Sequence, residues 1–389
     1  PDGATIEAVS RAPAGLVYAP DLAESQLRPD HPLKPARARD CYRLLEGAGA
    51  LGGGGIEVLG PPAADVQEVL RVHTPDYVEV VRALSAPPPG GALRPDAGAR
   101  YGLSEHGDTP PYPGMFEYGL RVCGASLESA RLVQSGAYRL AFNPAGGVNH
   151  HAMASRASGF GVFNDAAVAI AWLLEQGQRV MYVDLDVHHG DGVEAAFEDD
   201  PRVLTVSLHE STRYLFPGPK GGAATDTGRG RGAGYSVNLP FEPYTGDEAW
   251  LWGFEEIVPP LYQAFAPDVL LVQLGADGYF SDPLAHLLLT SRAYETAARR
   301  LRALTEGRLV AVGGGGYVVE ATPRIWALEL VTLAGLDLPP RFATALAAWR
   351  DPPGSGPEVP AEIQRRTRAG AEEAVATVKR LVFPVHGLA

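Results

Sequence analysis

Five ionisable side chains follow one apolar run, and their spacing favours metal chemistry. The run from Arg179 to Val183 is apolar, aromatic and β-branched, as expected of a strand buried on both faces of a sheet. Asp184, Asp186 and His188 follow at the two-residue period, so a continued extended backbone would place them on one face. Such donors suit zinc or another divalent first-row ion. A solvated acidic turn is the plain alternative, but burying these groups without a metal or hydrogen-bond partners is costly.

Chemically useful residues also follow four other predicted strands, with helical segments between them. These strands, each with the residues that follow it, are 138–142 with His150 and His151, 202–208 with Phe216, 268–274 with Asp277, and 308–312 with Tyr317. Alternating strands and helices predict an α/β fold with a mostly parallel sheet and helices on both faces. Ligands of such sheets bind at the carboxyl ends of the strands, where all these residues are expected.

Together these residues favour metal-assisted hydrolysis of an amide-like bond. A metal held by Asp186, His188 and Asp277 would keep positions open for water and a carbonyl oxygen. The adjacent His150 and His151 supply an acid/base pair that titrates near neutral pH.

Three further groups complete the predicted site. Asp184 and Asp191 are free to orient one imidazole each, and Tyr317 can donate a hydrogen bond to an oxyanion. Phe160 and Phe216 could wall a narrow channel, although each alone is more often a core residue.

Two glycine runs invite a nucleotide-binding interpretation. The run 228–234 leaves a loop and enters a predicted strand, 235–239, whereas a dinucleotide fingerprint lies between a strand and a helix. We interpret it as a flexible hairpin connection. The run Gly313–Gly316 precedes a predicted helix and could cradle a phosphate, or it could let the backbone turn and carry Tyr317 inward.

Composition narrows the class of protein. The 389 residues are 46% hydrophobic and carry a net charge of −13, which argues against nucleic acid or an anionic membrane as the main partner. The two cysteines are far apart, and no secretion signal or spanning segment is evident, so we expect a soluble protein of the reducing cytoplasm.

No repeat or domain boundary is evident, so we expect one domain over residues 1–389. Its core should span about 14–335, with a proline-rich stretch and a terminal helix, 361–381, packed on that core. The proline- and glycine-rich stretch 85–114 is expected to be a long loop, which is usually either functional or disordered. His31 and His73 each stand alone and are expected to form hydrogen bonds rather than bind a metal.

Several ordered motifs resemble the histone deacetylase superfamily: Asn149–Ala152, Tyr182–Gly192, Gly275–Asp277 with Asp282 and Pro283, and Gly313–Tyr317. The resemblance runs from about residue 18 to 330. Three further segments are similar to bacterial acetoin-utilisation (AcuC-type) deacetylases, which are akin to class I histone deacetylases: 31–35, 207–210 and 214–218. The resemblance implies a single arginase-like domain that removes acetyl groups from protein lysines with zinc or iron(II).

The resemblance also implies a role for each matching residue. Asp186, His188 and Asp277 bind the metal, His151 is the general base and then the acid, and His150 is its electrostatic partner. Asp184 and Asp191 pair with the two histidines, and Tyr317 polarises the acetyl carbonyl. The tunnel for the acyl-lysine side chain is lined by Gly159, Phe160 and Phe216. Leu284 lies at the rim of this tunnel, and Asp108 holds the substrate backbone. One potassium ion is expected at Asp184, Asp186, His188, Ser207 and Leu208, and a second at Phe197, Asp200, Val203 and Tyr235.

Alternatives remain within this interpretation. An acetylpolyamine amidohydrolase would use the same chemistry, but the apolar Leu284 and the backbone-binding Asp108 favour a peptide. A catalytically silent acetyl-lysine binder would be expected to have lost a metal ligand, a dyad histidine or Tyr317, and none is missing. The resemblance suggests acetylated acetyl-CoA synthetase as the protein partner. Acyl-chain length, the native metal and the oligomeric state stay open.

Overall fold

Eight parallel strands form one sheet in the part of the chain that the structure, a computed structural model, describes. That part is residues 14–389 without 26, 54, 87–97, 306 and 337–339. The strand order is β2-β1-β3-β8-β7-β4-β5-β6. The strands are β1 (Ala14–Val17), β2 (Ile56–Leu59), β3 (Leu140–Asn143), β4 (Val180–Asp184), β5 (Val203–Glu210), β6 (Ser236–Phe241), β7 (Val269–Gln273) and β8 (Leu309–Val312).

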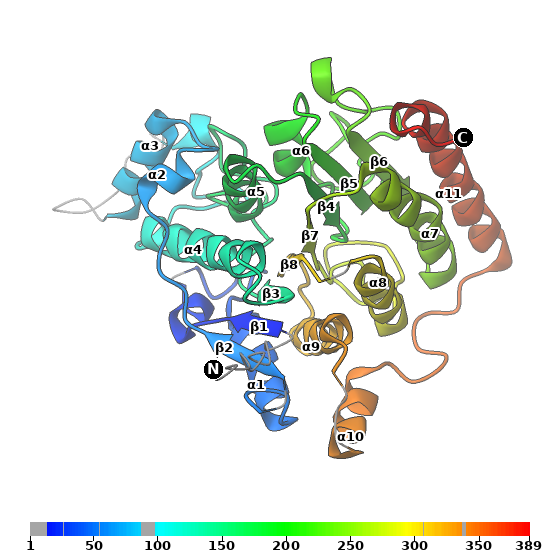
Figure 1. Ribbon diagram of the computed structural model, residues 1–389, viewed down its shortest axis with the longest axis horizontal. Helices are drawn as coiled ribbons and strands as arrows, with labels where there is room; N and C mark the ends of the chain where they lie inside the picture. The colour runs from blue at the N-terminus through cyan, green and yellow to red at the C-terminus, as the bar shows by residue number, and fades with distance from the viewer. Residues whose placement is uncertain (1–13, 26, 54, 87–97, 306, 337–339) are drawn as a thin grey trace, which may run out of the picture.

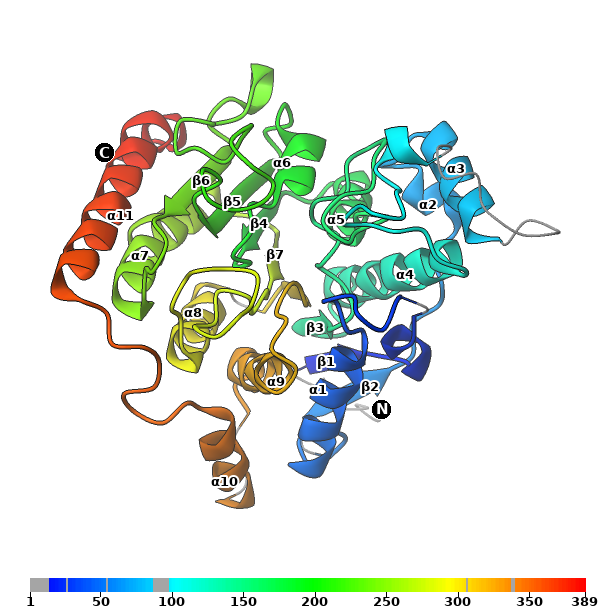
Figure 2. The same ribbon diagram turned by 180° about the vertical axis from the view of Figure 1, so that it is seen from behind.

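Helices cover both faces of this sheet (Figures 1 and 2). One side carries α2 (Val66–Val69), α3 (Pro75–Ser85), α4 (Met115–Gln134), α5 (Asp165–Glu175) and α6 (Asp191–Phe197). The other carries α1 (Ala36–Gly47), α7 (Asp247–Phe265), α8 (Ser291–Leu304), α9 (Ala321–Ala334), α10 (Pro340–Trp349) and α11 (Ala361–Leu381). The expected α/β architecture with two helical layers is therefore confirmed, and every strand pairing is parallel.

The alternating side chains of β4 explain why both faces need helices. Val180 and Tyr182 belong to the core under α4 and α5, whereas Met181 and Val183 belong to the core under α7, α8 and α9. A strand whose two faces are both apolar is stable only when each face is covered. This burial leaves the end of β4 as the place where polar side chains emerge.

Several sequence-based expectations differ from the structure. The segment before β6 is no hairpin, because β5 and β6 are parallel and need a crossover connection. The strand β4 ends at Asp184, so Asp186 and His188 lie in a loop and not on a continued strand. The strand β2 and the helices α2 and α10 were not predicted, since each is short or lies among prolines.

The C-terminal helix α11 packs along the edge strand β6 and the helix α7 (Figure 1). Its apolar side, which includes Val375 and Val378, joins the main core, while its charged side faces out. Among the described residues, no helix combines the length and the apolar character that a membrane crossing requires. Part of the expected loop 85–114, residues 87–97, lies outside the described residues.

Candidate active site and metal centre

Three buried side chains form a potential metal site at the carboxyl ends of β4 and β7. They are Asp186 and His188 from the loop after β4 and Asp277 from the loop after β7. One ligand atom of each lies within 4.8 Å of those of the others. Nδ1 of His188 lies 3.1 Å from Oδ1 of Asp186 and 3.0 Å from Oδ2 of Asp277. The structure thus brings together the three ligands predicted from the sequence.

The surroundings of this cluster fit a divalent cation. Burial raises the pKa of the Asp277 carboxyl, and the nearby Asp186 raises it further, because two negative charges share a dry site. Oδ2 of Asp186 accepts hydrogen bonds of 2.7 Å from the Gln273 side chain and from the backbone N–H of Gly315. These bonds fix the carboxylate, as the outer contacts of metal ligands do. Two carboxylates and one imidazole are donors that suit a divalent first-row ion, and three protein ligands leave a coordination position open.

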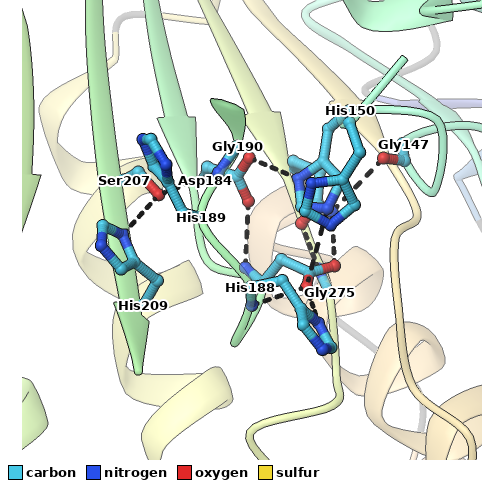
Figure 3. A network of polar contacts seen from close by, with 12 residues as sticks. Gly147, His150, Asp184, His188, His189, Gly190, Ser207, His209 and Gly275 are labelled. Carbon is cyan, nitrogen blue, oxygen red and sulfur yellow. Dashed lines mark hydrogen bonds and ion pairs between the residues drawn. The ribbon is translucent and has the colours of Figure 1, made fainter. Parts of the chain in front are cut away.

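Each histidine of the dyad has its own carboxylate. Nδ1 of His150 donates to Oδ2 of Asp184 over 2.8 Å, and Nδ1 of His151 donates to Oδ1 of Asp191 over 2.6 Å. The ring centroids of the histidines are 4.0 Å apart. Asp184 is also held by the Tyr182 hydroxyl at 2.7 Å, and Figure 3 follows the polar network from His209 and Ser207 to His150 and His188. The expected pairing of two aspartates with two histidines is present.

The two histidines differ in charge although they are neighbours. Burial alone would lower the pKa of His150, but Asp184 and then Asp186 outweigh it and raise the pKa to about 9. Burial, followed by repulsion from His150, lowers the pKa of His151 to about 4 despite Asp191. His151 is therefore a neutral imidazole beside the His150 cation at neutral pH. A neutral imidazole can accept a proton from water, and its conjugate acid readily gives that proton up again.

Tyr317 is held at the site through its backbone. Its N–H donates to Oδ2 of Asp282 over 2.7 Å, and the other oxygen of this carboxylate accepts from the backbone N–H of Leu284 at 3.0 Å. The buried Arg37 donates to the carbonyl of Gly316 over 2.5 Å. Burial raises the pKa of the Tyr317 hydroxyl well above its usual value, and Asp277 raises it further, so the hydroxyl stays a proton donor.

A cavity of about 200 Å³ leads from the surface to these groups. Its lining combines the predicted tunnel residues with the chemical groups: Asp108, Val148, His150, His151, Gly159, Phe160, Asp186, His188, Leu215, Phe216, Leu284 and Tyr317. The Phe216 ring packs edge-on against His151, with centroids 4.8 Å apart, and the Phe160 ring packs against Tyr317 at 5.8 Å. Asp108 accepts from the backbone N–H of Gly159 at 3.2 Å. The five residues predicted to bind the substrate therefore line one cavity.

The predicted potassium ligands lie in two places. Ser207 and Leu208 are on β5, next to Asp184 on β4, and the Ser207 hydroxyl lies 2.9 Å from Nδ1 of His209. The second set surrounds the turn after α6, where the N–H of Asp200 donates to the carbonyl of Phe197 and the N–H of Val203 donates to that of Asp200. The Tyr235 carbonyl accepts from the backbone N–H of Thr205, which lies two residues beyond Val203 on β5. Binding of potassium remains a prediction for both places.

The two lone histidines form hydrogen bonds, as expected. Nε2 of His73 accepts from the backbone of Asn164, the residue that caps α5, and its Nδ1 lies 3.0 Å from the carbonyl of Met153. Nδ1 of His31 accepts from the backbone of Leu33 at 3.1 Å, and its ring packs against Phe160. Neither belongs to the metal cluster found among the described residues.

Several residues that hold the site in place had no role predicted from the sequence. They are Arg37, Tyr182, Gln273 and Asp282. The signal for Asp282 was present, since the Asp282-Pro283 pair follows the metal aspartate in the motif. Nothing in the sequence singled out Arg37, which lies 279 residues from the carbonyl that it binds.

The chain is similar to known proteins over most of its length. A model of the histone deacetylase domain matches residues 31–333. The acetoin utilization protein AcuC of Bacillus subtilis (strain 168) is 36% identical over 364 residues, which cover 89% of this chain and 92% of that protein. The AcuC protein of Staphylococcus xylosus is 32% identical, and the match covers 84% of this chain and 83% of that protein. The AcuC protein of Staphylococcus aureus (strain MSSA476) is 33% identical, and the match covers 82% of this chain and 80% of that protein.

Proposed function

The chain belongs to the histone deacetylase family, and we propose that this deacetylase hydrolyses the acetyl amide of Nε-acetyl-lysine in proteins. The observation that carries the proposal is the shared cavity, where a buried Asp/His/Asp cluster, a histidine dyad and Tyr317 meet at the end of a narrow channel. A linear acyl-lysine side chain is the kind of group that such a channel accepts.

We assign zinc or iron(II) to Asp186, His188 and Asp277. A divalent ion held there supplies Lewis-acid polarisation of the acetyl carbonyl and activation of a water molecule. The fit rests on the donor set and its burial, because two adjacent buried carboxylates need a cation to offset their repulsion. The potassium ions implied by the resemblance would be structural ions, held through β5 and the turn after α6.

The protein groups divide the proton transfers between them. His151, neutral at neutral pH, takes a proton from the attacking water and later gives it to the leaving lysine amine. His150, held positive by Asp184, offsets the negative charge that develops on the carbonyl oxygen. The Tyr317 hydroxyl donates a hydrogen bond to that oxygen, and Asp191 keeps the His151 ring oriented with its free nitrogen toward the cavity.

The mouth of the cavity supports a peptide substrate over a small polyamine. Asp108 is exposed beside Gly159, where it can accept hydrogen bonds from the backbone of a bound peptide. Leu284, which also lines the cavity, offers no charge to a polyamine cation. The names of the relatives refer to acetoin utilization, and with the resemblance they suggest cytoplasmic acetyl-CoA synthetase as the acetylated partner.

The deciding experiment compares an acetyl-lysine peptide with an acetylated polyamine. Metal-stripped protein is assayed before and after zinc or iron(II) is restored. Metal-dependent release of acetate from the peptide, faster than from the polyamine, is expected. Preference for the polyamine would move the function to small-molecule metabolism, and turnover of neither would support a binding protein without catalysis.

A further inference from the structure

A buried carboxylate at the end of β5 binds the segment that carries one wall of the tunnel. Glu210 is the last residue of β5 and is fully buried. Its Oε2 accepts from the backbone N–H of His286 at 2.8 Å, and its Oε1 accepts from Nδ1 of the same residue at 2.8 Å. His286 lies two residues beyond Leu284, which lines the cavity. The carboxylate therefore holds both the main chain and the side chain of this segment.

The Glu210 and His286 side chains are buried to different degrees. This difference indicates that His286 orients the segment through its hydrogen bond and does not mainly pack against the core. The Glu210 side chain has no exposed surface, whereas the His286 side chain is 49% exposed. A half-exposed imidazole adds little to the hydrophobic core. Its Nδ1–H, however, satisfies a carboxylate oxygen that would be costly to leave unpaired inside the protein. The two residues consequently depend on each other for position.

Glu210 also lies directly before the loop that carries Phe216, another residue of the cavity wall. Its backbone N–H donates to the carbonyl of Val187, next to the metal ligand His188. The loop that leaves β5 turns at Ser211, whose carbonyl accepts from Leu215, and this loop carries Phe216. One residue thus joins the loop of Phe216, the loop of His188 and the segment of Leu284.

The segment of Leu284 has a second attachment at its other end. The N–H of Leu284 donates to Asp282, whose other oxygen binds the backbone of Tyr317. Asp282 therefore serves the catalytic tyrosine as well as the rim, whereas the Glu210 carboxylate binds the rim segment through His286. The backbone carbonyl of His286 in turn accepts from the N–H of Tyr244. The rim segment is held between two buried carboxylates.

We propose that Glu210 and His286 form a positioning pair that fixes Leu284 against the Phe216 loop and so sets the width of the tunnel mouth for the acyl-lysine stem. The inference rests on the proposed function, because it assigns a specificity role at the same site. Loss of the pair should weaken binding of the peptide without disturbing the groups that perform the chemistry. KM should change more than kcat, since His150, His151 and Tyr317 do not contact the pair.

Two substitutions of His286 test whether the position of its hydrogen-bond donor matters, or only the presence of a polar side chain. In His286→Asn the amide nitrogen can stand where Nδ1 stood and donate to Glu210, whereas in His286→Gln the longer side chain places its amide beyond that point. His286→Gln should raise KM for an acetyl-lysine peptide about tenfold and leave kcat within about twofold. His286→Asn should stay within about twofold of the wild type in both. His386→Gln, which replaces another hydrogen-bonded imidazole at Gly234, is the control.

Hydrogen exchange of residues 284–288 gives a readout that needs no activity. His286→Gln should speed exchange in this segment relative to the wild type and to His286→Asn, with metal content unchanged. Glu210→Gln should act in the same direction, and if it fails to fold, the two His286 variants still decide. The proposal would be overturned if His286→Gln had the exchange rate and KM of the wild type. It would also be overturned if His286→Asn and His286→Gln had equal exchange rates and equal KM. A wild-type enzyme inactive on acetyl-lysine would instead refute the proposed function, and the exchange data would still decide on the pair.

Discussion

The backbone N–H of Tyr317 donates to Oδ2 of Asp282 over 2.7 Å, so a buried carboxylate and not the glycine run alone sets the position of the tyrosine. Burial raises the pKa of Asp282 to about 6, although the N–H groups of Tyr317 and Leu284 oppose the rise. The same carboxylate links the catalytic edge of the tunnel with its rim.

Asp282→Asn should therefore slow catalysis more than it weakens metal binding. The Asp282 carboxylate accepts from the backbone N–H groups of both Tyr317 and Leu284. An amide has only one acceptor oxygen, so its NH2 group would face one of these N–H groups and displace Tyr317. We expect kcat to fall about 10- to 100-fold. Steady-state kinetics and metal analysis check this. The control is Asp226→Asn, because the Asp226 carboxylate accepts the backbone N–H of Ala223 in a loop. Wild-type kcat in Asp282→Asn would show that the tyrosine is positioned without it.

Removal of the Tyr317 hydroxyl should abolish most turnover and leave the fold intact. Tyr317→Phe should lower kcat about 100- to 1,000-fold, because one donor to the developing oxyanion is lost. Tyr244→Phe, at an exposed ring, should have no such effect. His151→Ala should also retain its metal and lose turnover, and full activity in that variant would contradict the assignment of the base.

The charge difference within the dyad can be measured directly in metal-free protein. NMR titration should give His150 a pKa of about 9 and His151 a pKa of about 4. Asp184→Asn should lower the pKa of His150, since its largest favourable partner is lost.

The same difference has a consequence for stability. The folded pKa of His150 exceeds its unfolded value of about 6.5. Its contribution is therefore full below pH 6.5 and is lost as pH rises through about 9. His151, with a folded pKa near 4, instead costs stability as pH falls below 6.5. Reversed values for the two rings would overturn this assignment.

Metal analysis should separate the proposed ligands from the orienting aspartates. Asp186→Ala and His188→Ala should purify without bound metal and lose activity, whereas Asp191→Asn should keep the metal, because Asp191 contacts His151 and lies outside the cluster. Chelation should also lower the melting temperature of the wild type, since a bound ion stabilises the folded state. An unchanged melting temperature together with full activity after chelation would argue against a metal-dependent enzyme.

Gly159→Ala should damage the site through a direct overlap. A Cβ at this position would lie 2.1 Å from Cδ2 of His151, and the backbone has a φ of +55° that side chains rarely adopt. Displacing the ring by about 1 Å should lower kcat/KM about 100-fold. Gly218→Ala is the matched control, because its φ is +94° but no atom lies within 4 Å of the added Cβ. It should cost about 1 kcal/mol of stability and little activity. Similar kinetics in both variants would contradict the overlap argument.

Much of the site could be predicted because local sequence carries it. Asp186 and His188 belong to one motif after one strand, and the apolar pattern of β4 fixes where that motif lies in the sheet. The rest depends on contacts between distant parts of the chain. Glu210 and His286 are 76 residues apart, and no pattern around either residue indicates the other. The hairpin predicted before β6 was wrong for a related reason: glycines mark a turn but do not tell the direction of the next strand.

By itself the sequence determined which chemical groups are present and that they follow strands of one parallel sheet, because residue types and hydrophobic periods are local properties. Only the tertiary structure decided which aspartate pairs with which histidine, and so which imidazole is charged. His150 meets Asp184 from β4, whereas His151 meets Asp191 at the start of α6. The pKa of a buried group depends on the charges that folding places beside it, and those neighbours come from separate elements of the chain.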